Sequence, residues 1–524
     1  MDNKYNDYLK LNVYQIYPKS FKDSNGDGIG DLGGIISKVD YLYDLGINAI
    51  WICPIYPSPM DDNGYDISDY YDIAKEYGTL DDLKLLIKKL HEKGMKLIMD
   101  FVANHTSTSH KWFIESRKSK DNYYSDFYYW KDRKNEHKSI FGGSAWELDD
   151  LRNQYYLHSF CVSQADLNFD NPNVRREMRK IIDYWIDLGV DGFRCDVIDM
   201  ISKDLDNHIY GNGPHLHEYI NELFKGTNLF TVGECSSKNI IDIKNKIASS
   251  REELVTLFQF DHIDISRKSK FIKGNPKLYE YRNVLSNWTK AFQDNDLIYT
   301  LFTDNHDQSF MLSRFFDFNN RYLGATLLAS MTYLLRGIPF IYQGIEYGSM
   351  NSKYNSIDDF DDIESINYYN EQIKYKDSKE VISEINFGGR DNPRRPMAFD
   401  SSEFGGFSDS ASWIAPSTNL KSINLENDLK SDKSIFRFYQ KILWLRNNNE
   451  AFTIGEFIDH SYDNNSFIYE RKYKDTSFIV ICNFDEENRI PYKYINGEIV
   501  LSNYNKERYK EEFLPYEVRI IRIS

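Results

Sequence analysis

The chain has 524 residues, of which 41% are hydrophobic, and a formal net charge of −16; this indicates a large globular protein of two or three domains, or one large barrel with insertions. The negative charge argues against nucleic acid as a partner, because phosphate binding needs a basic surface. No apolar run approaches the roughly 20 residues that cross a bilayer, and the N-terminus lacks a signal-peptide pattern, so we expect a cytoplasmic protein without membrane contact.

Eight short apolar runs rich in β-branched residues follow one another, with helix-like segments between them. They lie at 11–18, 47–54, 95–105, 190–198, 228–234, 254–262, 297–307 and 337–344. The segments 80–94 and 171–189 have the 3.6-residue periodicity of amphipathic helices, and the first ends at a glycine. This alternation predicts an α/β fold, a (β/α)8 TIM barrel.

Two parts of the chain depart from the alternation. The segment 105–172, between the third strand and the next helix, is too long to be structureless in a compact protein and predicts an inserted domain. After residue 450, alternating runs such as 466–484 and 516–524 predict a C-terminal antiparallel β-domain. We therefore expect a barrel at 1–104 and 173–450, an inserted domain at 105–172, and a β-sandwich at 451–524.

Acidic residues stand at the C-terminal ends of four predicted strands, where a barrel of this type has its functional site. They are Asp100, Asp196, Glu234 and Asp307. Any one of them could be only a helix cap or a loop carboxylate. Four at one barrel mouth would repel one another unless their pKa values are split or a cation or substrate lies between them, which predicts an active site.

His105 and His306 accompany these carboxylates, at the ends of the third and seventh predicted strands. HxH and HExxH spacing are absent, so hydrogen bonding to a polyol is a better interpretation than a metal site. The chain has five widely spaced cysteines without a CxxC pair, which indicates free thiols in a reducing compartment.

Four segments, "DFVANH", "GFRCDVI", "TVGE" and "FTDNHD", resemble the signature regions of the α-amylase superfamily, the family-13 glycoside hydrolases. A fifth, "QADLNFDNP" (164–172), resembles a region of its oligo-1,6-glucosidase group, and the likeness covers residues 11–440. The resemblance implies a retaining mechanism with Asp196 as nucleophile and Glu234 as general acid/base. It also implies that Asp307 holds the sugar hydroxyls and stabilises the transition state.

The chemistry of a retaining glycosidase is compatible with these residues, since it needs two carboxyls roughly 5 Å apart. Arg194, two residues before Asp196 on a strand, should face the same side and lower the pKa of the nucleophile. Glu234 must keep its proton until it donates it, and the negative field of its neighbours favours this. Cys195 should point away from the pocket, and the sequence leaves the roles of Cys195 and Cys235 open.

The resemblance also implies a subsite for the non-reducing glucose, in which Tyr65 supplies a stacking face. Its residues are Asp62, Tyr65, His105, Arg194 and His306. Arg390, in "GGRDNPRRPMAFD", matches an arginine that pairs with a sugar-binding carboxylate and helps to close the pocket. That segment departs from the usual family pattern, which makes Arg394 an alternative to Arg390.

The segment "DSNGDGIGD" (23–31) resembles the first part of an EF-hand loop, without the glutamate at its twelfth position. Its oxygen ligands would be Asp23, Asn25, Asp27, the Ile29 carbonyl and Asp31. The alternative is a turn that follows the first strand. The family resemblance implies a structural Ca²⁺ (or Mg²⁺) here, remote from catalysis, and we expect no organic cofactor.

Val197 follows the nucleophile, and by the resemblance valine here accompanies α-1,6 specificity, although it could be only a β-branched strand residue. We therefore expect a monomeric exo-acting α-glucosidase that cleaves terminal α-1,6 bonds, and also α-1,4 bonds, of short oligosaccharides such as isomaltose. The alternatives are a trehalose-6-phosphate hydrolase, a sucrose-active or transglucosylating relative, and a non-catalytic barrel like the transporter heavy chains. The last class carries a membrane helix and has lost the carboxylates that this chain retains.

Overall fold

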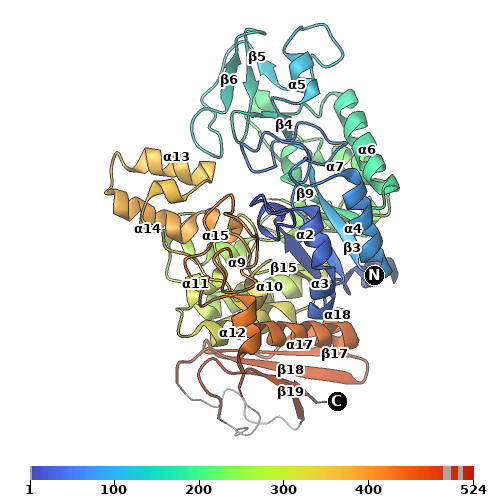
Figure 1. Cartoon of the computed structure of the whole chain (residues 1–524). Helices are drawn as coiled ribbons and strands as arrows, with labels where there is room; N and C mark the ends of the chain where they lie inside the picture. The colour runs from blue at the N-terminus through green and yellow to red at the C-terminus, as the bar shows by residue number, and fades with distance from the viewer. Residues whose placement is uncertain (1–2, 236, 488–496, 505–511, 524) are drawn as a thin grey trace.

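The computed structural model describes residues 3–235, 237–487, 497–504 and 512–523, and a parallel eight-stranded barrel forms its centre (Figure 1). The barrel strands are β1 (Val13–Ile16), β2 (Ala49–Ile52), β3 (Lys96–Val102), β9 (Gly192–Asp196), β10 (Phe230–Glu234), β11 (Thr256–Phe258), β14 (Thr300–Leu301) and β15 (Ile338–Tyr342). Each lies within one of the eight predicted runs, and the predicted TIM-barrel fold is confirmed.

The strand order is β11-β10-β9-β3-β2-β1-β15-β14, and every pair in it is parallel. The two end strands approach each other through side chains: the Thr300 hydroxyl donates to the Leu257 carbonyl at 3.0 Å, and the Thr256 hydroxyl to the Ile298 carbonyl at 2.7 Å. The barrel is therefore nearly closed, which brings the carboxyl ends of all its strands to one mouth.

Helices surround the barrel. The main ones are α2 (Leu32–Ser37), α3 (Val39–Leu45), α4 (Leu80–Glu92), α6 (Pro172–Asp187), α7 (Leu216–Phe224), α8 (Ile240–Ile247), α10 (Leu278–Asp294), α12 (Arg321–Tyr333) and α17 (Ile435–Asn448). In α4, Thr79 and Asp82 form a capping box, and Leu83, Leu86 and Leu90 are buried. Gly94, at φ +71°, follows the helix in the left-handed region, as the sequence predicted.

The segment between β3 and α6 lies at the top of Figure 1, above the barrel mouth. Its elements are β4 (His105–Ser107), α5 (Lys111–Ser116), β5 (Trp130–Lys131), β6 (Trp146–Asp149), β7 (Gln154–Leu157) and β8 (Gln164–Asp166). Strands β4 and β8 pair with each other, and β5, β7 and β6 form a second antiparallel sheet. We call residues 105–171 the inserted segment.

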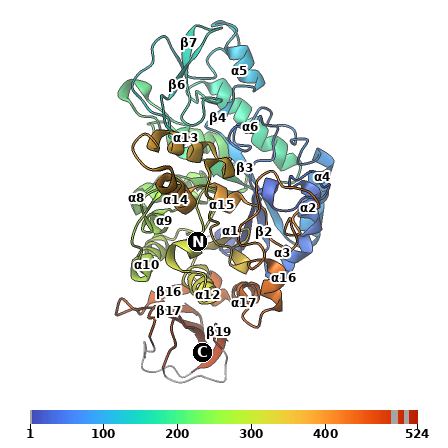
Figure 2. The same ribbon diagram turned by 60° about the vertical axis from the view of Figure 1, so that its left-hand side comes forward.

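A second projection rises beside the mouth and approaches the inserted segment (Figures 1 and 2). It consists of α13 (Ile363–Gln372) and α14 (Ser378–Gly388), with β12 (Arg267–Ser269) and β13 (Ile272–Lys273) at its base. A separate small core that includes Phe271, Val381 and Ile385 holds it together. The remaining short helices are α1 (Asn3–Tyr8), α9 (Asp261–Asp264), α11 (Met311–Phe315), α15 (Asp391–Arg394), α16 (Leu425–Lys430) and α18 (Glu450–Thr453).

The C-terminal domain is antiparallel, as predicted. Its strands are β16 (Glu456–Asp459), β17 (Ser466–Tyr473), β18 (Thr476–Asn483), β19 (Glu498–Ser502) and β20 (Val518–Arg522). They form one five-stranded sheet in the order β16-β17-β18-β20-β19, and in the described part of the domain no second sheet completes a sandwich. The sheet packs against α12, where the Tyr469 hydroxyl donates to the Ser330 carbonyl at 2.6 Å.

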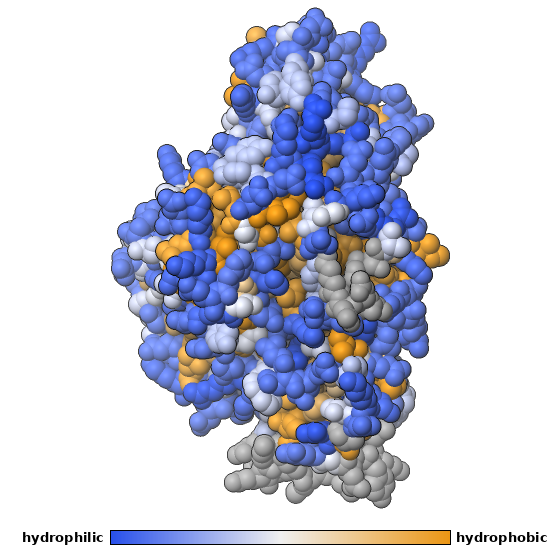
Figure 3. Space-filling view, turned by 90° about the vertical axis from the view of Figure 1, so that its right-hand side faces the viewer, coloured by the Kyte–Doolittle hydropathy of each residue, from blue (hydrophilic) through white to orange (hydrophobic). Residues whose placement is uncertain are grey.

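The surface agrees with the charged composition. Figure 3 shows one face of the molecule, on which hydrophilic residues predominate and hydrophobic residues form scattered patches. Of the helices that the structure describes, none combines the length and the apolar character needed to span a bilayer.

Candidate active site

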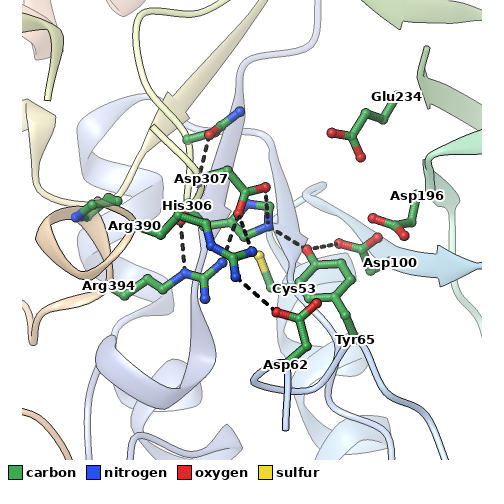
Figure 4. A network of polar contacts seen from close by, with 12 residues as sticks. Cys53, Asp62, Tyr65, Asp100, Asp196, Glu234, His306, Asp307, Arg390 and Arg394 are labelled. Carbon is green, nitrogen blue, oxygen red and sulfur yellow. Dashed lines mark hydrogen bonds and ion pairs between the residues drawn. The ribbon is translucent and has the colours of Figure 1, made fainter. Parts of the chain in front are cut away.

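Strand register brings the predicted carboxylates together at the barrel mouth. In the pairing of β3 with β9, Asp100 lies opposite Arg194 and Val102 opposite Asp196. Glu234 is the last residue of β10, the next strand. Figure 4 shows Asp100, Asp196 and Glu234 on one side of the site, facing Asp307 and His306 from the segment after β14.

Arg194 is a buried cation shared by three carboxyls. Its Nη1 donates to Asp100 Oδ1 at 2.8 Å and to Asp196 Oδ1 at 2.7 Å, and its Nη2 donates to Glu234 Oε2. Arg194 and Asp196 thus face the same side, as strand parity predicted. Because both nitrogens belong to one planar guanidinium, the Asp196 and Glu234 carboxyls are held close together at fixed orientation.

Burial and Arg194 act in opposite directions on the pKa values of this group. Burial raises the pKa of Asp196 above its usual range, although Arg194 acts in the opposite direction. Arg194 lowers the pKa of Asp196, as predicted, but one positive charge does not offset the desolvation of Asp196 beside a second buried carboxylate, Asp100. Burial likewise raises the pKa of Glu234 to about 7, with Arg194 lowering it and Asp196 raising it. The pair can therefore retain a proton near neutral pH, as an acid/base catalyst requires.

Asp307 has the opposite environment. Its Oδ1 accepts from Arg394 Nη2 at 2.8 Å and lies 3.5 Å from Arg390 Nη1. Burial alone would raise its pKa, but the neighbouring His306, Arg394 and Arg390 hold the pKa of Asp307 well below its usual range. Between these two pKa values Asp307 is ionised while Glu234 is protonated, so the two carboxyls can serve as hydrogen-bond acceptor and acid, respectively.

A chain of polar contacts joins the two sides of the site. Gln15 Nε2 lies 2.8 Å from His306 Nδ1, and His306 Nε2 lies 2.8 Å from the Tyr65 hydroxyl, which donates to Asp100 Oδ2 at 3.0 Å. The amide nitrogen of Gln15 only donates, so His306 Nδ1 accepts and Nε2 carries the proton. Burial lowers the pKa of His306 to about 3, so the ring is neutral, and it stacks on Tyr65 with centroids 5.3 Å apart. Figure 4 shows this chain from His306 to Asp100.

Both candidate arginines lie at the site, in different places. Arg390 Nη2 lies 3.2 Å from Asp62 Oδ1, and Arg390 Nε donates to Asp362 at 2.7 Å. Arg390 lines the cavity, whereas Arg394 lies behind it, where it contacts Asp307 and donates to the His306 carbonyl at 3.0 Å. Arg390 thus pairs with Asp62 and Arg394 with Asp307, and both of these carboxylates were predicted to contact the sugar.

These residues line an open cavity of about 190 Å³. The predicted residues that line it are Asp62, Tyr65, His105, Asp196, Val197, Glu234, His306, Asp307 and Arg390. Arg194 was also expected to line it, but at 2% exposure it lies beneath Asp196 and Glu234. By contrast, 24% of the Glu234 side chain is exposed, so this carboxyl can reach a bound molecule.

Sequence reasoning missed several residues of the site. The additional lining residues are Ile140, Phe141, Phe160, Lys270, Gln308 and Glu364. Gln164 Nε2 donates to Asp62 Oδ2 at 3.0 Å, and the Trp51 indole donates to Asp100 Oδ2 at 3.1 Å. Gln164 opens the quoted segment "QADLNFDNP", which could have identified it. For Gln15 and Trp51 the sequence offers no such signal.

Of the two residues that flank the nucleophile, Val197 lines the cavity and Cys195 does not. Val197 adopts φ +33°, a left-handed conformation that is strained for a β-branched residue. Its amide donates to Glu234 Oε2 at 3.3 Å, and its side chain lines the cavity. Cys195 is fully buried and is not among the lining residues, in agreement with a packing role. Cys235 is also a buried free thiol.

The segment 23–31 forms a loop of hydrogen-bonded turns. Asp23 accepts from the amides of Asn25, Gly26 and Gly28 and from the Ser408 hydroxyl, and Asp31 caps α2 through the Gly34 amide. Among the described residues, no three carboxylate, imidazole or thiol side chains converge to hold a metal ion. The oxygen-only donor set fits Ca²⁺ in kind, but its two buried carboxylates are satisfied by protein donors.

Comparisons with known proteins agree with this geometry. Residues 15–455 match the family model described as the catalytic domain of alpha amylase. An oligo-1,6-glucosidase of Parageobacillus thermoglucosidasius is 40% identical, covering 98% of both chains. A trehalose-6-phosphate hydrolase of Bacillus subtilis (strain 168) is 39% identical, covering 91% of this chain and 89% of the other. The crystal structure of the trehalulose synthase from Pseudomonas mesoacidophila MX-45 superposes with a TM-score of 0.93 at 34% identity, covering 99% of each chain.

Proposed function

This chain belongs to the α-amylase family of glycoside hydrolases, and from that premise we propose that it is a retaining, exo-acting α-glucosidase. Its substrates are short oligosaccharides such as isomaltose, from which it hydrolyses the non-reducing terminal α-1,6 bond, with α-1,4 bonds as a second class. The observation that carries this proposal is the Arg194 guanidinium, which holds Asp196 and Glu234 together at the edge of one small cavity.

The two carboxyls divide the reaction as a retaining mechanism requires. Glu234 donates its proton to the glycosidic oxygen while the Asp196 carboxylate attacks the anomeric carbon, so that the bond to the leaving sugar breaks as a glycosyl ester forms. Water then attacks the anomeric carbon, gives a proton to Glu234 and releases Asp196. Arg194 serves both steps because it contacts both carboxyls, and its charge favours ionised Asp196 against the effect of burial.

The other charged residues recognise the terminal sugar. Ionised Asp307 accepts hydrogen bonds from sugar hydroxyls, and Arg394 fixes its orientation. Asp62, held by Arg390 and Gln164, serves a second hydroxyl. Pockets for drug-sized ligands measure roughly 300–1,000 Å³, so a cavity of about 190 Å³ fits one terminal sugar ring rather than the interior of a chain.

The bond specificity rests on Val197 and on the relatives. Val197 lines the cavity next to the proposed nucleophile, and its amide donates a hydrogen bond to the proposed acid, Glu234. Its side chain therefore lies beside the bond that is cleaved. The relatives include an oligo-1,6-glucosidase. A panel of isomaltose, panose, maltose, sucrose, trehalose and trehalose 6-phosphate tests the proposal: isomaltose should be the best disaccharide, and hydrolysis of trehalose 6-phosphate alone would refute it.

A trehalose-6-phosphate hydrolase is the second candidate, because one relative carries that name. The charges at the cavity favour the first candidate. Its described lining has five carboxylates, Asp62, Asp196, Glu234, Asp307 and Glu364, against two cations, Lys270 and Arg390. Lys270 pairs with Glu364, and Arg390 pairs with Asp62, so neither cation is left to bind a phosphate dianion. A transglucosylating enzyme would transfer glucose to a sugar acceptor instead of water, and a sucrose-active enzyme would use sucrose as the glucosyl donor. Product analysis on the same substrate panel distinguishes both from the proposed hydrolase.

For the loop 23–31 we propose a structural Ca²⁺, with Mg²⁺ as the alternative. The support is the donor set of Asp23, Asn25, Asp27, the Ile29 carbonyl and Asp31, which contains only oxygen. The loop packs on the segment 407–413, since the Trp413 amide donates to the Gly28 carbonyl at 3.0 Å. Chelation should therefore lower the melting temperature more than the rate at moderate temperature. An unchanged melting temperature, with no metal found in the purified protein, would refute this proposal.

We also propose that the enzyme is a cytoplasmic monomer. All five cysteines are free thiols, four of them buried, which suits a reducing compartment. Light scattering coupled to size exclusion measures the mass directly, and a stable mass of twice the 61.9 kDa chain would contradict the monomer.

A further inference from the structure

A hairpin of the inserted segment reaches across the barrel mouth. We call residues 137–145 the rim hairpin: Lys138 and Ser144 pair as an antiparallel bridge, and the Ala145 amide donates to the His137 carbonyl at 3.0 Å. Gly142 and Gly143, at φ +93° and +76°, close the turn in a conformation that favours glycine. The tip carries Ile140 and Phe141, which line the cavity.

Helix α13, far away in the sequence, contacts the tip of this hairpin from the other side of the mouth. Asn367 Nδ2 donates to the Phe141 carbonyl at 3.1 Å. Glu371 is one turn further along the same face of α13, and its Oε1 lies 3.1 Å from the position that a Cβ on Gly142 would occupy. The rim hairpin and α13 are therefore in direct contact along one helical face.

This contact holds a residue whose side chain lies over Arg390. The Phe141 ring centroid lies 4.8 Å from Arg390 Cζ, in cation–π range. Arg390 in turn donates to Asp362, the N-cap of α13. The residues thus form a closed ring, from Arg390 through Phe141 and Asn367 along α13 to Asp362 and back to Arg390.

We propose that Asn367 is a positioning residue for substrate length. By holding the Phe141 carbonyl, it keeps the Phe141 ring over Arg390 and bridges the mouth on the side of α13. The cavity is then closed on that side and admits only the end of a short chain. This inference rests on the proposed function, and it adds a residue that does not line the cavity itself.

Kinetics on isomaltose and on longer isomalto-oligosaccharides test the proposal. Asn367→Ala should raise KM for isomaltose by about two- to ten-fold, the range that one neutral hydrogen bond supports, with kcat within about two-fold. Activity on the longer substrates should rise relative to isomaltose. Asn367→Asp, whose carboxylate cannot donate to a carbonyl, should raise KM for isomaltose at least as much. Asn370→Ala, the same change at an exposed position of α13, should leave KM and the preference for substrate length as in the wild type.

A double substitution shows whether Asn367 acts through Phe141. Phe141→Ala alone should raise KM, and adding Asn367→Ala to it should change KM no further. A further several-fold rise in the double variant would overturn the proposal, as would an unchanged KM and unchanged length preference in Asn367→Ala.

Hydrogen exchange separates this proposal from the proposed function, because it needs no substrate. Asn367→Ala should speed amide exchange in residues 139–145, whereas Asn370→Ala should not. Equal exchange in the two variants would refute the bridging contact. If the wild type does not hydrolyse isomaltose while exchange changes as expected, the proposed function fails and the contact stands.

Discussion

Replacing Arg194 by Met removes the cation that contacts both proposed catalytic carboxyls. Met replaces the aliphatic stem of arginine but not its guanidinium, so Asp100, Asp196 and Glu234 lose their shared donor. The buried Asp100 and Asp196 and the half-buried Glu234 would then face one another without the Arg194 charge. We expect the pKa values of both Asp196 and Glu234 to rise further, because Arg194 lowers both in the native protein.

The magnitude follows from the contacts that are lost. A hydrogen bond to a charged group contributes about 1.5–3 kcal/mol, and Arg194 makes one to each catalytic carboxyl. The two together amount to about 3–6 kcal/mol, which corresponds to a loss of roughly 10²–10⁴ in kcat/KM. The stability should also fall, because breaking a buried ion pair costs about 3–5 kcal/mol.

The assay is kcat/KM on isomaltose as a function of pH. The wild-type profile should be bell-shaped, limited on the acid side by Asp196 and on the alkaline side by Glu234, and in Arg194→Met both limbs should move to higher pH. Arg194→Lys keeps the positive charge but cannot bridge both carboxyls as the guanidinium does. It should therefore lower kcat/KM, with a smaller shift of the pH profile than Arg194→Met. Arg176→Met, at an exposed arginine of α6, controls for the substitution itself. A folded Arg194→Met variant with near-normal kcat/KM, or with a profile moved to lower pH, would refute the reasoning.

Four further outcomes are expected. In the wild type, kcat/KM should fall as pH rises through about 7, because Glu234 must be protonated to act as the acid; a rate that is constant from pH 6 to 9 would contradict this assignment. Asp196→Ala and Glu234→Gln should each abolish nearly all turnover, and near-normal rates in either would exclude the mechanism. Val197→Ala or Val197→Thr should raise activity on maltose relative to isomaltose, and an unchanged ratio would remove Val197 from the specificity argument. A thiol reagent should not inactivate the folded enzyme through Cys195, since that thiol is fully buried; rapid inactivation from which substrate protects would show otherwise.

The barrel was predictable because its strands are buried on both faces and therefore appear as short continuous apolar runs. All eight predicted runs contain a barrel strand. Their lengths were less predictable: the run 297–307 forms a ladder only at Thr300–Leu301. The chain leaves the barrel soon afterwards and places His306 and Asp307 in a loop, a tertiary constraint that no local propensity encodes.

The carboxylates of the site were predictable from their positions at strand ends, but their electrostatics were not. Strand parity showed that Arg194 and Asp196 share a face. It could not show that Asp100 and Glu234 would share the same guanidinium, or that burial would outweigh the charge. The contact of Asn367 with Phe141 joins residues 226 positions apart, and no periodicity in the sequence links them.

The most direct test of the central claim is the anomeric configuration of the glucose released from p-nitrophenyl α-glucoside, whose leaving group is not a sugar, followed by proton NMR before mutarotation. A double displacement through Asp196, with Glu234 as acid and then base, predicts that α-glucose appears first and β-glucose only later. Initial release of β-glucose would contradict the account, because it would require direct attack by water rather than by the aspartate.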